Sequence, residues 1–207
     1  MNTKTAKSVI KEFIVSLLGF AFIIFILFNC YTLYSVWRAY SYLPERQQQE
    51  YIRFMIYGSS SSPEGNTISA SFSIVDSNGN EISKIERSWV GNYLAVEFAE
   101  TGFDDKTFLF PTAIYGKERI MQTKSGRRKT SLEKFYDDNG QCLLLGFGST
   151  YKERNELYKI ARFATKKLPV FTFGRVSLYS LDLSSCKINR YYSIQRISNG
   201  NLVVVEL

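Results

Sequence analysis

Histidine is absent from all 207 residues of the chain. Its absence excludes Ser-His-Asp and Cys-His activation of a nucleophile, every metal site with a histidine ligand, and a histidine pH switch. An enzyme built on this chain would have to use other groups, such as a pair of carboxylates.

Cysteine is scarce, with only Cys30, Cys142 and Cys186, and no two of them form a C-x-x-C motif. Zinc ribbons and thioredoxin-like redox sites are therefore unsupported, and we expect no metal and no cofactor. In an oxidising compartment Cys142 and Cys186 could form a disulfide, which would stabilise the fold by about 4 kcal/mol, less any strain. Two separate buried thiols are the alternative.

Polar residues are almost missing from the segment Phe13 to Phe28, where Ser16 is the only one. The apolar character continues, diluted, to Trp37, and at 1.5 Å per residue this stretch spans about 37 Å, enough for a tilted crossing of a bilayer. An aromatic belt follows at its C-terminal end, made of Tyr31, Tyr34, Trp37, Tyr40 and Tyr42. We therefore expect residues 13–37 to form a transmembrane helix that contacts the lipid bilayer.

Two other readings of this segment are weaker. A cleaved signal peptide needs an A-x-A-like site, and none follows the apolar run. A lipoprotein signal would acylate Cys30, but the residues after it are apolar and aromatic rather than a polar tether.

The apolar segment contains no G-x-x-x-G pair, so it has no recognised helix-dimerisation face. Asn29 could hydrogen-bond a partner helix, or snorkelling and local water could satisfy it. Three lysines precede the segment (Lys4, Lys7 and Lys11) and three arginines follow it (Arg38, Arg46 and Arg53), so the positive-inside count is a tie. Because a downstream domain can cross largely regardless of charge, we expect a cytoplasmic N-terminus and an extracytoplasmic C-terminal domain in the cell membrane.

After the apolar segment, Pro44 and Gly58 are typical of the start and end of a short juxtamembrane helix, and a serine-rich linker follows to Asn66. From Thr67 to Asp76 apolar residues alternate with serines, which predicts a strand with one buried face. Asn78-Gly79 predicts a hairpin in which both turn residues have positive φ. Further strands are expected over Glu81–Trp89, around Leu94–Phe98, and over Thr107–Phe110, the last stopping near Pro111.

In the second half, Cys142–Leu145 predicts a buried strand, and Thr150 with Glu153 predicts a capping box before a helix that ends near Thr165. Its stripe of Leu157, Ile160, Ala161 and Ala164 should pack on the sheet. Three more strands are expected, over Val176–Leu183, Arg190–Ile197 and Leu202–Glu206, with a hairpin at Asn199-Gly200.

These elements predict an α+β, mostly β fold: an N-terminal transmembrane helix followed by a soluble domain of about seven or eight antiparallel strands with one packed helix. The expected organisation is a short cytoplasmic tail (1–12), the transmembrane helix (13–37), a juxtamembrane helix and linker (38–66), and a β-rich soluble domain (67–207).

Four short patterns suggest chemistry, and a structural reading is stronger for each. Residues 76–80 resemble part of a calcium loop but lack its glycine and its bidentate glutamate. Residues 146–150 form a glycine-containing turn before a helix, without a nucleotide-binding fingerprint. Ser131 and Lys134 match S-x-x-K without the companion motifs of that enzyme class. Asp104-Asp105 and Asp137-Asp138 are carboxylate pairs at turns, where aspartate bonds the backbone.

The sharpest surface feature is a basic run whose charged members are Lys124, Arg127, Arg128 and Lys129. Together with the net charge of +7 it favours anionic contacts, such as lipid headgroups or an acidic polymer, and nucleic acid is the less favoured partner. The plain reading is a solvated loop.

Three functions remain open. The first is a non-enzymatic, envelope-associated protein whose domain contacts other proteins or the cell-surface matrix. The second is a membrane-tethered enzyme that uses Asp and Glu on envelope polymers. The third is a cytoplasmic-facing binder of anionic lipid or nucleic acid. A cleft with converging carboxylates would favour the second, and an exposed apolar patch or uncovered edge strand would favour the first.

Overall fold

The structure is a computed structural model, which describes residues 3–44, 49–63, 65–103, 106–119, 129–167, 170–172, 174–197 and 200–207. The first half of the chain contains α1 (Thr3–Tyr42), β1 (Glu50–Ser62), β2 (Gly65–Val75), β3 (Glu81–Val90), β4 (Tyr93–Phe103) and β5 (Lys106–Lys117). Short elements follow: β6 (Thr130–Ser131), the 3₁₀ turn η1 (Glu133–Phe135), β7 (Asp137–Asp138), β8 (Gln141–Cys142) and η2 (Leu143–Leu145). The chain ends with α2 (Tyr151–Ala164), β9 (Val176–Asp182), β10 (Tyr191–Arg196) and β11 (Leu202–Glu206).

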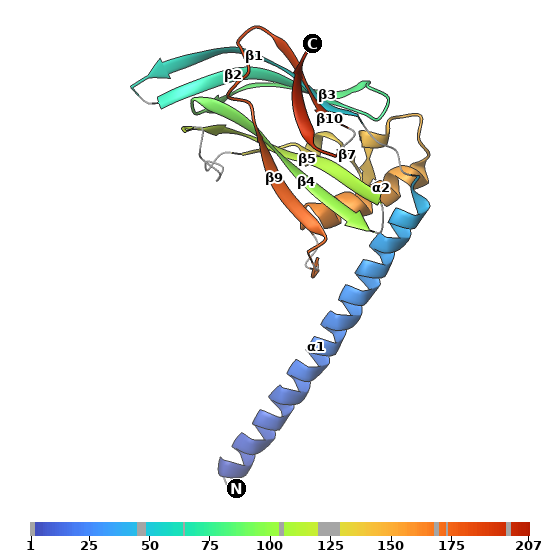
Figure 1. Ribbon diagram of the computed structural model, residues 1–207. Helices are drawn as coiled ribbons and strands as arrows, with labels where there is room; N and C mark the ends of the chain where they lie inside the picture. The colour runs from blue at the N-terminus through green and yellow to red at the C-terminus, as the bar shows by residue number, and fades with distance from the viewer. Residues whose placement is uncertain are drawn as a thin grey trace.

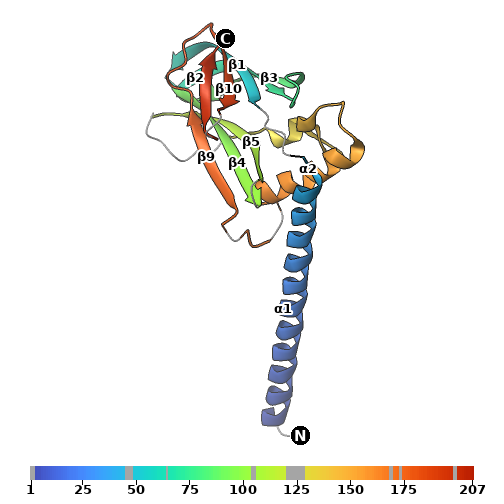
Figure 2. The same cartoon turned by 45° about the vertical axis from the view of Figure 1, so that its right-hand side comes forward.

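Two antiparallel sheets pack face to face, and β7 and β8 form a separate two-stranded sheet (Figure 1). Sheet A has the order β11-β10-β1-β2-β3, and sheet B has the order β6-β5-β4-β9. The end of α1 and the helix α2 cover the other face of sheet B, so the layers are sheet, sheet and helices (Figure 2). The expected mostly β fold, with an apolar N-terminal helix and one packed helix, is confirmed.

Sheet A follows the alternating pattern that the sequence predicts for β2. Ile68, Ala70, Phe72 and Ile74 are buried between the sheets. The serines of β2 alternate with them, and of these Ser69 and Ser73 are half-buried and Ser71 is buried. The aromatic rings at the centre stack, with 5.3 Å between the centroids of Phe54 and Phe72.

The predicted juxtamembrane helix between Pro44 and Tyr57 is wrong where the structure describes it, because residues 50–62 form β1. Ile52, Phe54 and Ile56 alternate and are all buried, and they pair with β2 across the same face. This period of two, together with β-branched and aromatic residues, outweighs the helix-start signal of Pro44. The serine-rich linker is not a linker either, since its described residues lie mainly in the ends of β1 and β2.

Pro111 does not end its strand as predicted, since β5 continues to Lys117. The register shifts opposite Pro111: Phe98 pairs with Pro111 and Glu97 with Ala113, which leaves Thr112 as an extra residue. A bulge of this kind is where a strand tolerates proline. The carbonyl of Thr112 then accepts a hydrogen bond from the Leu132 N–H at 2.8 Å, which attaches the short strand β6.

The hairpin between β2 and β3 is confirmed, but of its two central residues only Gly79 has positive φ, at 80°. The Gly79 N–H donates to the Asp76 carbonyl and the Asp76 N–H to the Asn80 carbonyl, so the loop has three residues and uses glycine at one left-handed position. The predicted strand over Cys142–Leu145 is wrong, because β8 ends at Cys142 and the next three residues form the 3₁₀ turn η2. The helix after it agrees with the prediction: Thr150 and Glu153 form the capping box, and the apolar stripe is buried.

Helix α1 is long and apolar enough to cross a membrane, by length and composition, over Glu12–Tyr42. Its apolar side chains are exposed from Phe13 to Phe28. Its last two turns are different, because Val36, Ala39, Tyr40 and Leu43 are buried in the core of the domain. One continuous helix therefore has an exposed apolar N-terminal part and a C-terminal end that is packed in the domain (Figure 1).

Candidate functional site

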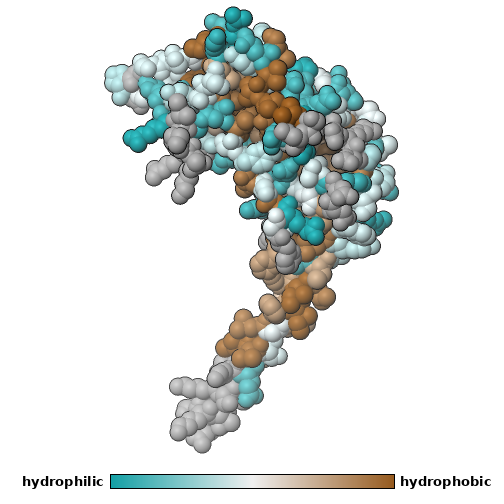
Figure 3. Space-filling view, viewed as in Figure 1, coloured by the Kyte–Doolittle hydropathy of each residue, from teal (hydrophilic) through white to brown (hydrophobic). Residues whose placement is uncertain are grey.

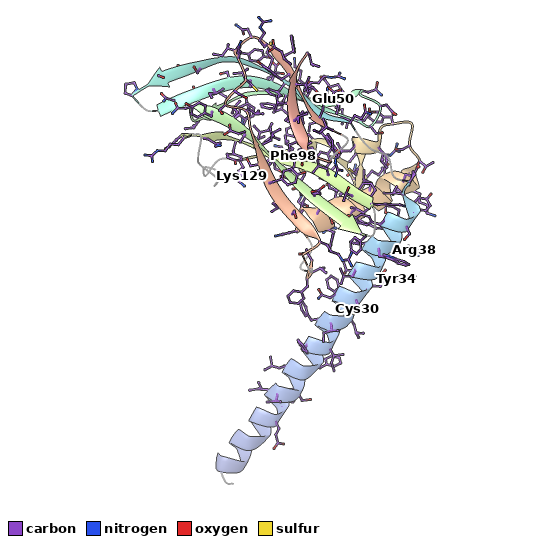
Figure 4. All side chains as sticks on the ribbon, viewed as in Figure 1. Cys30, Tyr34, Arg38, Glu50, Phe98 and Lys129 are labelled. Carbon is purple, nitrogen blue, oxygen red and sulfur yellow. The ribbon has the colours of Figure 1, made fainter. Side chains whose placement is uncertain are left out.

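The basic run lies mostly outside the described residues, which include Lys129 but not Lys124, Arg127 or Arg128. The Lys129 ammonium donates to both carboxylate oxygens of Glu97, at 2.6 and 2.7 Å, and lies 5.6 Å from the centre of the Tyr115 ring (Figure 4). Its charge is thus compensated on the outer face of sheet B. This pairing weakens Lys129 as an anion-binding group, and the anionic-surface hypothesis for the run stays a prediction.

The calcium-like turn and the glycine turn pack against each other. Both oxygens of the buried Asp76 carboxylate accept hydrogen bonds from the turn, including 2.8 Å bonds from the Asn78 and Asn80 N–H groups. The neighbouring Ser77 bonds to the carbonyls of η2. A Cβ at Gly146 would lie 2.5 Å from an Asp76 carboxylate oxygen, so glycine is needed for this close approach. The two turns therefore have a structural role, since their contacts hold the β2–β3 hairpin against η2.

The remaining sequence candidates lie in turns and packing contacts. Asp137 accepts a hydrogen bond from the Gly140 N–H within the tight β7–β8 hairpin. The Lys134 ammonium lies 4.9 Å from the Phe135 ring centre, and Ser131 is exposed on β6. The pair Asp104-Asp105 falls outside the described residues. Among the described residues, no three His, Cys, Asp or Glu side chains gather as metal ligands would.

Cys142 and Cys186 are both free thiols in the structure, the first buried and the second half-buried. Burial raises the pKa of the Cys142 thiol to about 12 and that of the Cys186 thiol to about 11. Thiols with such pKa values are poor nucleophiles at neutral pH. The disulfide stays a prediction, and no reactive cysteine is indicated at either position.

The strongest candidate site is a cleft that the sequence alone did not reveal. It opens where edge strand β9 of sheet B faces edge strand β11 of sheet A, and it has a volume of about 520 Å³. Figure 3 shows apolar residues gathered on this face of the domain. The lining residues are Glu100, Tyr179, Leu181, Ile197, Gly200, Asn201, Leu202 and Val203.

The polar group at this cleft is an ion pair rather than a free carboxylate. Arg196 donates to a Glu100 carboxylate oxygen at 2.9 Å, to the Thr107 hydroxyl at 3.1 Å and to the Gly200 carbonyl at 3.1 Å. These contacts bind the β10–β11 hairpin to sheet B. They also occupy the one acid that lines the cleft among the described residues.

The aromatic groups near the ion pair are arranged for packing. Phe98 lies between two tyrosines, with ring centroids 6.1 Å from Tyr51 and 6.4 Å from Tyr179 (Figure 4). Burial raises the pKa of Tyr51 to about 12, although the Arg196 charge acts in the opposite direction. Burial also raises the pKa of Tyr179 above its ordinary value. Both phenols are therefore neutral at physiological pH, which suits an apolar binding surface.

The backbone of β11 presents hydrogen-bonding groups at the mouth of the cleft. The Leu207 N–H donates to the Tyr191 carbonyl at 2.9 Å, and the Ile197 N–H donates to the Asn201 carbonyl at 3.0 Å. Each of these bonds joins two residues that lie directly opposite each other, and hydrogen-bonded pairs alternate with non-hydrogen-bonded pairs along an antiparallel ladder. Val204 lies opposite Ile194 in a non-hydrogen-bonded pair, so its N–H and C=O point away from β10. β11 pairs only with β10 in the part of the chain that the structure describes.

The sequence analysis did not predict this site. The sequence shows that the β11 strand is apolar and unprotected, but not where the strand lies in the fold. The run Leu202 to Val205 is apolar and carries no lysine or proline, the residues that commonly protect an edge strand. Nothing in the sequence shows that β11 lies at an edge or that β9 faces it. Comparisons with protein-family models, with curated proteins and with solved structures find no match to this chain.

Proposed function

We propose that the protein is a membrane-anchored, non-enzymatic interaction protein that binds an extended apolar segment of a partner protein in the cleft between β9 and β11. Helix α1 anchors it in the cell membrane with the N-terminus in the cytoplasm and the β-rich domain outside. The observation that carries the proposal is the apolar cleft of about 520 Å³ beside edge strand β11, which has β10 as its one paired strand among the described residues.

The mode of binding follows from the outward backbone of β11. An extended peptide can pair with the outward N–H and C=O of Val204 as an added strand, and alternate side chains can enter the cleft. Leu181, Leu202 and Tyr179 supply the apolar contacts. Main-chain pairing would provide affinity, and the cleft would select the side chains.

The carboxylate enzyme is the weaker alternative. Glycoside hydrolysis needs two carboxyl groups that face each other across a cleft. Glu100 is the one acid that lines this cleft among the described residues, and it is bound to Arg196. The cytoplasmic binder of anionic ligands is also weaker, because the described member of the basic run is paired with Glu97.

The test of partner binding uses the full chain in its own membrane, with a photoreactive amino acid in place of Ile197. This residue lines the cleft and is 42% exposed. We expect cross-linking to a discrete protein. Val204→Pro should abolish the adduct because it removes an outward N–H without touching the ladder to β10, whereas Val204→Thr, which keeps the N–H, should not.

A photoreactive residue at Val90 provides the position control, since it is 55% exposed on the opposite edge strand, β3. Equal cross-linking from both positions, or an adduct unaffected by Val204→Pro, would overturn strand addition at β11. Protease digestion of intact cells tests the topology: the domain should be degraded while the N-terminal tail is protected.

A further inference from the structure

The described residues between α2 and β9 (165–167, 170–172 and 174–175) are called the α2–β9 segment, and Phe171 in this segment lies against α1. The Phe171 N–H donates to the Asn29 side-chain oxygen at 3.0 Å, although 142 residues separate the two. The rings of Phe171 and Phe25 meet edge to face, with 5.7 Å between centroids. Figures 1 and 2 show this segment beside α1, and Figure 4 shows it at the level of Cys30.

The Asn29 side chain makes two hydrogen bonds here, one as donor and one as acceptor. Its amide nitrogen donates to the Phe25 carbonyl at 2.8 Å, and its oxygen accepts from Phe171. It is 6% exposed, whereas the large apolar side chains from Phe13 to Phe28 are each at least 39% exposed. The α2–β9 segment therefore covers the polar side chain that follows the apolar run, at a depth where water is scarce.

The position of the bilayer along α1 follows from two limits. Glu12 precedes the apolar run, and Val36 is already in the core of the domain. A bilayer core of about 30 Å needs about 20 helical residues, which counted from Phe13 end at Thr32. Phe25 and Asn29 then lie roughly 5 to 10 Å inside the hydrocarbon boundary.

The part of the segment that meets α1 suits this depth. Val170 is half-buried, and Phe171 is 61% exposed although it contacts α1, so most of its ring faces outward. Cationic residues stand at both ends of the segment: Lys166 and Arg175 are exposed, and Arg175 lies 4.2 Å from the Phe103 ring centre. An apolar tip with cations behind it matches the acyl and phosphate layers of a bilayer.

We propose that the α2–β9 segment is a second membrane contact, in which Val170 and Phe171 insert among the lipid acyl chains beside α1. Lys166 and Arg175 lie at the headgroup phosphates. The contact rests on the proposed anchoring by α1 and extends it: helix and segment together fix the domain in one pose on the membrane surface. The occupant of this apolar surface is lipid, because the surface is continuous with the lipid-facing side of α1.

Quenching by brominated lipids tests the insertion. The full chain carrying Trp37→Phe and Phe171→Trp is reconstituted in phosphatidylcholine vesicles, with or without bromine on the acyl chains. Trp89 remains in all variants; it is 3% exposed within the domain and bonded to Thr130, so it reports the unquenched background. We expect the acyl bromines to remove at least half of the emission added by Phe171→Trp.

The matched control is Leu178→Trp in the same Trp37→Phe background, because Leu178 is 58% exposed but lies on β9 within the domain. It should show no quenching. Equal emission from Phe171→Trp in brominated and plain vesicles would overturn the insertion. Flotation of the same samples separates the two proposals: a chain that floats with the vesicles but shows no quenching refutes the second contact alone, and a chain that does not float refutes the anchor.

Discussion

Lys106 holds the end of α1 against the domain, and its removal should loosen that junction. Its ammonium, at the start of β5, donates to the Tyr40 carbonyl at 3.0 Å and to the Leu43 carbonyl at 2.8 Å. The last carbonyls of a helix have no partner within the helix and carry the negative end of its dipole. One lysine thus satisfies two such groups from a strand more than 60 residues away.

The magnitude follows from these two bonds. A hydrogen bond that involves a charged group contributes about 1.5–3 kcal/mol, and Lys106 is only half-buried, so we expect Lys106→Met to cost about 2 kcal/mol in total. For a chain of this size that corresponds to a fall in Tm of about 4–8 °C. Methionine keeps most of the aliphatic stem, so packing changes little.

The assay is thermal unfolding of the full chain in detergent micelles, followed by tryptophan fluorescence. Lys84→Met is the control, because the same substitution there removes an exposed ammonium that forms an ion pair with Glu86 on sheet A. Exposed pairs often contribute nothing measurable, so this variant should leave the Tm unchanged. Equal Tm values for the two variants would refute the capping role of Lys106.

Three further predictions concern buried charge, thiols and the domain boundary. Burial raises the pKa of Asp182, but hydrogen bonds from Lys117 and the Ser184 N–H outweigh it, so the net pKa lies below the ordinary value and Asp182 stabilises the fold above about pH 4. Asp182→Asn should cost about 2 kcal/mol at pH 7 in urea unfolding, because it removes the carboxylate that compensates the charge of the buried Lys117 ammonium. Lys117→Met removes that charge as well and should cost less than half as much. The deficit of Asp182→Asn should shrink as the pH falls below about 4. Iodoacetamide at pH 8 should leave Cys142 unmodified in the native chain, and finding both Cys142 and Cys186 reactive after denaturation without reductant would exclude their disulfide. A chain that begins at Leu33 should give a folded, monomeric domain by size exclusion and NMR dispersion. A chain that begins at Glu45 should aggregate because it lacks the buried residues Val36, Ala39, Tyr40 and Leu43, and a well-folded shorter chain would show that the fold does not depend on them.

Local signals predicted the elements whose own residues decide their conformation. The alternation in β2 and the Thr150–Glu153 capping box needed no knowledge of the rest of the chain. β1 was predicted as a helix because Pro44 and Gly58 are helix boundaries in isolation, but β1 is stabilised by pairing with β2 and β10. Tertiary pairing overrode a local signal there, as it did when the bulge at Thr112 let β5 run past Pro111.

The candidate site could not be predicted from the sequence, because it too depends on tertiary arrangement. Its two walls come from β9 and the β10–β11 hairpin, and they face each other only because both strands lie at edges on the same side of the sandwich. The contact between Asn29 and Phe171 was missed similarly. The sequence offered a partner helix or local water as the hydrogen-bonding partner of Asn29, but the structure gives it a backbone N–H of the same chain.

The continuity of α1 has a consequence for how a partner can reach the cleft. The helix ends in the core of the domain, and β1, the middle strand of sheet A, begins at Glu50, so residues 43–49 alone connect α1 to the centre of a sheet. With Lys106 on the last turn of α1 and Phe171 on its exposed part, the domain is held to the helix at two levels. A domain on a flexible stalk could rotate its cleft toward any neighbour. Contacts at two levels oppose such rotation here. In the proposed anchoring, the orientation of α1 therefore sets the direction in which β9 and β11 face, and the proposed partner segment approaches from that side.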